Sequence, residues 1–262
     1  MRRPTFPPLH RLIPALVASL LFSACHSASK LAKASAPRPS PFLVNADSLK
    51  PPADKKQAFL RQWRGGEPAH WDLVLEQRRI HVAPVELGHL RAATRSLSKV
   101  ACPDSVRRSQ ARKWSKDLHE RIIAALVADK PAWTILDQPQ SGALLLELAL
   151  VEFNPNPIIG GIARKGINIA LWPGAEAAVS HKLKGSVAIE GRMRLGPDGP
   201  ILYEFSDAEQ VRSGLILNYH DYTHFSFSQK LASEWTKQIL RCILQRAEGQ
   251  NPDSLAATLR LW

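Results

Sequence analysis

The sequence predicts an α+β fold: an antiparallel or mixed four- to five-stranded sheet with two main helices packed on one face. Three observations predict it. Segments with strand character follow one another, one amphipathic helix interrupts them, and a second helix comes near the end of the chain. Consecutive strands with so few helices favour α+β over the regular strand and helix alternation of α/β folds. The 262 residues are 45% hydrophobic, enough for one sizeable core.

The first predicted strand covers residues 79–85, where polar and apolar side chains alternate until Pro84 interrupts the strand or places it at an edge. A helix follows, because residues 103–105 supply cap residues and apolar residues then recur three and four positions apart as far as Asp129. Trp114 is in phase with these positions, so we expect it in the core.

A short strand at 133–136 and a long one at 143–153 come next. The long segment is apolar on both faces, which predicts that both faces are covered. Apolar residues also crowd into the connection at 155–183, and a structureless loop of that length is unusual. Either it folds as a short helix or hairpin against the sheet, or it is a partly exposed lobe that docks a partner or the bilayer.

An antiparallel hairpin is predicted at 186–205, with its tight turn at the Gly-Pro-Asp-Gly of 196–199. Its first strand alternates, so we expect one face to be exposed. The apolar face would carry Val187, Ile189, Met193 and Leu195, and the exposed face Ser186, Glu190, Arg192 and Arg194. An amphipathic helix from about 226 to 247 follows.

The N-terminus has the pattern of an export signal. Arg2, Arg3 and Arg11 precede a mostly apolar run at 12–24, which is too short to span a bilayer but long enough for a signal peptide. Small residues then precede Cys25, which resembles the bacterial lipobox, where the thiol receives diacylglycerol and the signal is cut before it. The alternatives are an ordinary cleavable signal with an incidental cysteine and an uncleaved anchor.

This pattern divides the chain into four parts. They are a lipoprotein signal peptide at 1–24, a lipidated flexible tether at 25–60, a single α+β domain at 61–250 and a tail at 251–262. Ser, Ala, Pro and Lys dominate the first half of the tether, whose lysines either contact anionic head groups or are simply solvated. His26 rather than Asp follows the cysteine, which by resemblance favours the outer membrane, with the domain facing the periplasm.

The chain is strongly basic, with 35 Lys and Arg against 23 Asp and Glu and a net charge of +12, so anionic partners are favoured. Basic residues form a cluster on the first predicted helix, with Arg78 and Arg79 nearby in sequence. We expect either that this cluster binds phosphates of lipid or lipopolysaccharide, or that it is a solvated face. Its members are Arg107, Arg108, Arg112, Lys113 and Lys116. Nucleic acid is a poor partner because an exported lipoprotein does not meet it.

Other patterns point only weakly to chemistry. His220 and His224 stand four apart, as metal ligands on one helical face do, but no third ligand is evident except a remote His181, so no metal or cofactor is expected. Glu190 and Glu204 fall on neighbouring strands like the paired acids of glycosidases, but Arg192 and its neighbour Arg194 would form salt bridges with them. We therefore expect no catalytic residues and no enzyme.

Four stretches of the mature chain, together with the lipobox, resemble the bacterial lipoprotein family of domain of unknown function 3313. They are FLVNADSLKP, HWDLVLEQRRIHVAPVEL, LLLELALVEFNPNP and IEGRMRLGPDGPILYEF. The chain departs from the family by its polar, aromatic NYHDYTHFSF segment. The resemblance implies an envelope lipoprotein without an assigned reaction. We expect a non-catalytic binding or assembly-helper module with an envelope protein or an anionic lipid or glycan as partner. The alternative is a periplasmic hydrolase acting on cell-wall or lipid material.

Lipidation of Cys25 would leave Cys102 and Cys242 as a pair. Export places them in an oxidising compartment, where an even pair can form a disulfide if the two helices pack side by side. The alternative is two reduced thiols, with Cys242 as a small apolar residue of the core.

Overall fold

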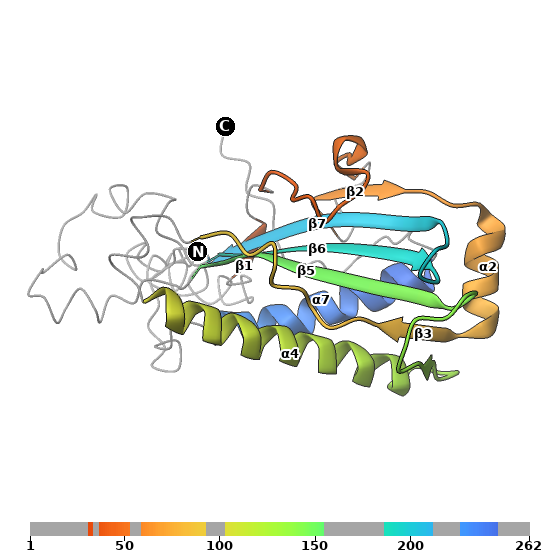
Figure 1. The fold of residues 1–262 in the computed structure, drawn as a ribbon. Coiled ribbons are helices and arrows are strands. Elements are labelled where there is room, and N and C mark those ends of the chain that lie inside the picture. Colours follow the sequence, from red (N-terminus) through yellow and green to blue (C-terminus); the bar gives the residue numbers. More distant parts are fainter. Residues whose placement is uncertain are drawn as a thin grey trace, which may run out of the picture. The chain divides into compact units, whose positions relative to one another are not determined.

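The computed structural model describes residues 31–33, 37–52, 59–92, 103–154, 186–211 and 226–245. It confirms the α+β class: in the described part of the chain, a mixed sheet carries two long helices on one face (Figure 1). The sheet has seven strands rather than four to five, in the order β1-β7-β6-β5-β3-β4, with β2 beside β7. None of the described helices is both long and apolar enough to cross a bilayer.

The seven elements predicted from the sequence are all present and in the predicted order. They are β3 (Arg79–Val82), α4 (Asp104–Ala128), β4 (Thr134–Ile135), β5 (Leu144–Asn154), β6 (Ser186–Leu195), β7 (Ile201–Val211) and α7 (Ser226–Leu244). Strand β6 is antiparallel to its two neighbours β5 and β7, whereas β3 runs parallel to both β5 and β4. The turn between β6 and β7 uses Gly196 at φ 74°, a conformation that glycine adopts without strain.

The additional elements lie before residue 79. They are β1 (Leu31–Lys33), the 3-10 turn η2 (Ala46–Ser48), β2 (Arg61–Arg64) and α2 (Pro68–Gln77). Strands β1 and β2 pair with successive parts of the same edge of β7, so each is short. Helix α2 buries only Trp71 and Val74, and its side chains at Glu67 and His70 form a capping box. Short elements with so few buried positions give no clear periodicity in the sequence.

Helices α4 and α7 cover one face of the sheet, as predicted. Trp114 is buried and its indole Nε1 donates a hydrogen bond to the Ser228 carbonyl of α7 at 2.6 Å. Its ring meets that of Trp235 edge to face at 5.8 Å. Trp235 in turn donates from Nε1 to the Asp207 carboxylate of β7 at 2.7 Å. The two tryptophans therefore join both helices and the sheet in one core.

The opposite face of the sheet is covered by residues 37–50, which we call the N-terminal strap. Phe42 and Leu43 are buried at 4% exposure each. They pack on Ala149, Val151, Ala188 and Ala208 of the three central strands. This confirms that β5 is covered on both faces. It corrects two other expectations, because the folded part begins within the range predicted as a tether, and on the polar side of β6 Glu190 is buried while Ser186, Arg192 and Arg194 are half-buried rather than exposed.

Gly191 of β6 offers a test of the core packing. A Cβ built on Gly191 would lie 2.1 Å from Cε1 of Phe205, whose ring is stacked on Phe59 at 3.8 Å and has little room to move. Gly191→Ala should therefore lower the free energy of unfolding by about 1 to 3 kcal/mol in urea titrations. The matched control is Gly88→Ala, since a Cβ at Gly88 meets nothing within 4 Å. Equal stabilities of the two variants would contradict this packing.

Candidate functional site

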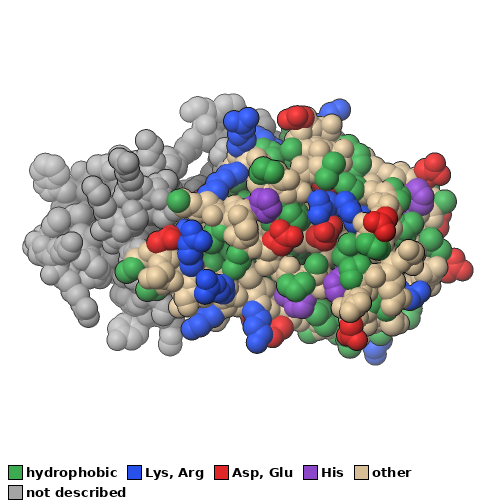
Figure 2. Space-filling view, in the orientation of Figure 1, with side chains coloured by type: hydrophobic (Ala, Val, Ile, Leu, Met, Phe, Trp, Pro, Cys, Tyr) green, Lys and Arg blue, Asp and Glu red, His purple; other side chains and the backbone are tan. Residues whose placement is uncertain are grey.

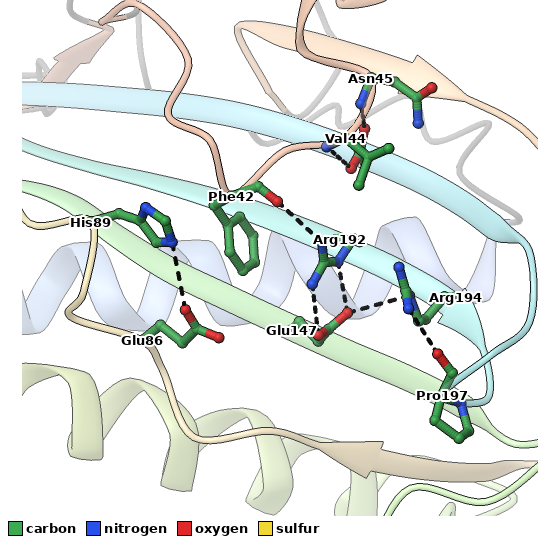
Figure 3. A network of polar contacts seen from close by, with 10 residues as sticks. Phe42, Val44, Asn45, Glu86, His89, Glu147, Arg192, Arg194 and Pro197 are labelled. Atoms are coloured by element: carbon green, nitrogen blue, oxygen red, sulfur yellow. Dashed lines mark hydrogen bonds and ion pairs between the residues drawn. The ribbon is translucent and has the colours of Figure 1, made fainter.

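The cluster of charged groups that the structure places together lies between the sheet and the N-terminal strap (Figure 3). Glu147 of β5, Arg192 of β6 and Glu204 of β7 are directly opposite one another on three neighbouring strands. Glu190 lies two residues before Arg192 and so on the same face. We call Glu147, Glu190, Arg192, Arg194 and Glu204 the polar face.

Arg192 is the centre of the polar face. Its Nε and Nη2 donate to the two carboxylate oxygens of Glu147 at 2.7 and 2.8 Å, a bidentate pair, and this hydrogen bonding raises the pKa of Arg192. Its Nη1 donates to the Phe42 carbonyl at 3.0 Å, and its guanidinium lies 4.8 Å from the centre of the Phe42 ring. Arg192 therefore holds the strap by both a hydrogen bond and a cation–π contact.

Two carboxylates bind the backbone of the strap. Glu204 accepts the N–H groups of Val44 at 2.8 Å and Asn45 at 2.7 Å, one on each oxygen. Glu190 accepts the N–H of Ser40 at 2.8 Å and the Ser40 hydroxyl on its other oxygen. Both carboxylates are fully buried, at 0% exposure. A buried charge is tolerated only when hydrogen bonds satisfy it, and here the strap supplies them.

This geometry corrects the expected pairing of the acids. Glu190 and Glu204 were expected to form salt bridges with the arginines of β6, but Arg192 pairs with Glu147. Arg194 lies 3.5 Å from Glu147 and donates to the Pro197 carbonyl of the turn. Every oxygen of the two buried carboxylates already accepts a hydrogen bond from the strap. In this structure the polar face thus forms hydrogen bonds with backbone groups of the strap.

The outer edge of the polar face is more open. His89 lies edge to face with Phe42 at 5.8 Å between ring centres. Its Nε2 is 3.7 Å from the Glu86 carboxylate, and the two side chains are 29% and 53% exposed. Among the described residues, no group of three or more His, Cys, Asp and Glu side chains is placed to hold a metal ion.

The structure divides the predicted basic cluster. Arg107 is buried at 1% exposure, where it pairs with Asp104 and donates to the Phe153 carbonyl, so its assignment to an anionic surface was wrong. Arg108 is exposed and also pairs with Asp104, whose pKa these two arginines lower. Arg112 and Lys113 are exposed.

Arg78 and Arg79 do not belong to this cluster. Arg78 binds Asp129, just beyond the other end of α4, and Arg79 binds Gln140. The 25 residues of α4 correspond to roughly 37 Å at 1.5 Å per residue, so the two groups of arginines lie far apart.

Cys242 is buried in the core and has no disulfide partner among the residues that the structure describes. Burial raises the pKa of this thiol to about 12. The neighbouring Tyr203, whose pKa burial also raises well above its usual value, donates from its hydroxyl to Gln62 at 2.6 Å. This environment fits the alternative of a small core residue. The disulfide stays a prediction, because Cys102 lies outside the described residues, as do Cys25, His220, His224 and the connection at 155–183.

Sequence analysis did not predict that residues of the strap contribute to this site. Ser40, Phe42 and Glu147 were not predicted to take part in it, and neither was Asp207 on the helix-covered face. One signal was available, since Glu147 is flanked by apolar residues in the middle of a strand expected to be buried on both faces. Such an acid requires a buried donor.

Comparisons with known proteins found similarity to solved structures. No family model matches the chain, and no curated protein matches it. Two solved structures of a PelC dodecamer from Paraburkholderia phytofirmans, in different crystal forms, are similar to it. Each is 13% identical, has a TM-score of 0.34, and aligns over 68% of this chain and 94% of its own. The resemblance to the lipoprotein family stays a prediction.

Replacing Glu204 tests how the strap is held. In Glu204→Gln one carboxylate oxygen becomes an amide N–H₂, so one of the two strap N–H groups loses its acceptor. We expect the free energy of unfolding to fall by about 1 to 3 kcal/mol. We also expect chymotrypsin to cut faster after Phe42 and Leu43, which are buried in the native strap.

The control for this variant is Glu76→Gln, the same chemical change at an exposed position of α2. Both proteins are digested under native conditions and the cut sites are identified by mass spectrometry. Cleavage of the strap at the same rate in the two variants would show that Glu204 does not hold it.

Proposed function

We propose that this chain is an outer-membrane-anchored lipoprotein of the periplasm whose α+β domain is a non-catalytic binding or assembly-helper module of the cell envelope. The single observation that carries the proposal is the N-terminal strap. The segment that would connect a lipidated Cys25 to the domain pairs with β7 at Leu31–Lys33, and its strap residues are bound by Glu190, Arg192 and Glu204.

The use of the charged residues supports a binding module. A glycosidase needs two carboxylates that face a substrate and a water. The two acids that best fit this pattern in the sequence are buried and bound to strap N–H groups. Nothing in the geometry of the described residues favours the alternative, a periplasmic hydrolase, over the binding module.

The position of β1 supports a domain held close to its anchor. Leu31 pairs with Val211 at the edge of β7 and lies only six residues after Cys25. Six residues of fully extended chain span at most about 20 Å. An acyl group on Cys25 would therefore keep this edge of the sheet near the membrane, instead of letting the domain move at the end of a long tether.

Metabolic labelling with radioactive palmitate tests the anchor. We expect the full chain, expressed in a Gram-negative host, to incorporate label and to fractionate with the outer membrane, because several acyl chains hold a protein on a bilayer for long periods. Cys25→Ser should abolish both. Cys102→Ser, the matched control, should retain both.

Two results would contradict the proposal. One is label that persists in Cys25→Ser. The other is a wild-type chain that remains in the soluble periplasmic fraction.

A further inference from the structure

The charged side chains of the described residues are unevenly distributed along the sheet. The first turns of α4 expose Arg108, Arg112 and Lys113. In Figure 2, Lys and Arg side chains gather over the half of the view in which α4 begins.

Two further arginines belong to the same end of the sheet. The N–H of Arg91 donates to the Val151 carbonyl near the end of β5, and its guanidinium donates to the carbonyl of Arg38. The buried Arg107 joins α4 to this end by its hydrogen bond to the Phe153 carbonyl. We call the exposed and half-buried set, Arg38, Arg91, Arg108, Arg112 and Lys113, the basic end.

Strand β1 lies at this end too. Ala32 pairs with Gln210, which pairs with Ser186, which pairs with Asn154, the last residue of β5. The chain therefore enters the sheet in the row where β5 ends, three strands away from β5 but at the same end of the sheet as Phe153 and the start of α4. The chain segment that leads back to Cys25 leaves the domain from its basic end.

The helix at the opposite end of the sheet carries only acidic charged side chains, although the basic residues Arg64, Arg78 and Lys130 also lie at that end. Helix α2 lies there (Figure 1), and it contains no Lys or Arg. Glu67, its N-cap residue, and Asp72 and Glu76 are all exposed. The basic end would thus be attracted to an anionic surface, while α2 would be repelled by it.

We propose that the basic end lies against the anionic phospholipid head groups of the membrane that carries the anchor, with α2 directed away from the bilayer. The inference rests on the proposed function in one respect: the anchor is what keeps the domain close to the membrane. The charge attraction itself does not require the acyl chains. It would give the domain a fixed orientation in which α2 and the strands next to it face the periplasm.

The magnitude of the effect can be estimated. Each Lys or Arg held near an anionic leaflet contributes about a fivefold factor to binding. The interaction acts within a Debye length, about 10 Å at 0.1 M salt. Arg108 contributes less than Arg112 and Lys113, because Asp104 pairs with it. The latter two side chains are therefore the most informative to replace.

Vesicle sedimentation tests the orientation without the anchor. The chain from residue 25 onward, carrying Cys25→Ser, is mixed with vesicles of phosphatidylcholine alone or with added phosphatidylglycerol. We expect binding only to the anionic vesicles, and weaker binding at 0.5 M salt. Arg112→Ala with Lys113→Ala should lower the partition coefficient roughly 25-fold. Both substitutions keep the helix, because alanine has the highest helix propensity.

The matched control removes two exposed basic residues from the other end, Arg64→Ala and Lys130→Ala. This variant has the same net charge as the double α4 variant, and we expect it to bind nearly as well as the parent. Equal losses in the two variants would mean that only net charge matters and would overturn the inference, as would a parent chain that does not bind. Because the protein carries no acyl group here, these results are independent of the palmitate experiment.

Discussion

The burial of two negative charges on the polar face is the constraint on which the rest of the structure depends. Glu190 and Glu204 lie at 0% exposure on the central strands of the sheet. A carboxylate in such a position destabilises a fold severely unless donors surround it. The donors come from residues 40–45, more than a hundred positions away in the sequence. The sheet and the strap are therefore stable only together.

The helix-covered face follows the same rule. Asp207 of β7 accepts the indole N–H of Trp235 on one oxygen and the N–H of Leu60 on the other, at 2.7 and 3.1 Å. One carboxylate thus joins α7 and the chain just before β2 to the same strand. Hydrogen bonds to charged groups contribute about 1.5 to 3 kcal/mol each, more than those between neutral groups. Buried acids on β6 and β7 therefore bind the segments that cover each face of the sheet: the strap on one face, and α7 and the chain before β2 on the other.

The sequence was most informative where the periodicity was long. The apolar stripe of α4, the apolar run of β5 and the turn between β6 and β7 predicted these elements close to their observed bounds. Sequence-based prediction of burial failed where a distant segment of the chain covers a strand whose local pattern indicates an exposed face. β6 alternates like a half-exposed strand, yet none of its residues is fully exposed, because the strap covers its polar face. The sequence did not predict this cover, because Ser40 and Phe42 come from a segment whose Ser, Ala and Pro content is typical of a linker.

The candidate site could be predicted only in part for the same reason. Glu190, Arg192 and Glu204 were placed on neighbouring strands correctly, and catalysis was set aside. Their partners were assigned wrongly, because spacing along a strand shows which acids and arginines share a face. Spacing along a strand does not show that backbone N–H groups from a remote segment also form hydrogen bonds with those acids. Each oxygen of Glu190 and Glu204 accepts a hydrogen bond from the strap, while the bidentate pairing of Arg192 goes to Glu147.

Under the proposed lipidation of Cys25, the coupling of strap and sheet means that a pull on the anchor would act on the centre of the domain. The most direct test of the coupling is hydrogen exchange at the amides of Ser40, Val44 and Asn45, followed in the native protein. The account predicts that these amides exchange as slowly as those of β6 and β7, opening only when the domain unfolds. Exchange at the rate of an unstructured peptide, with β6 and β7 still protected, would contradict it.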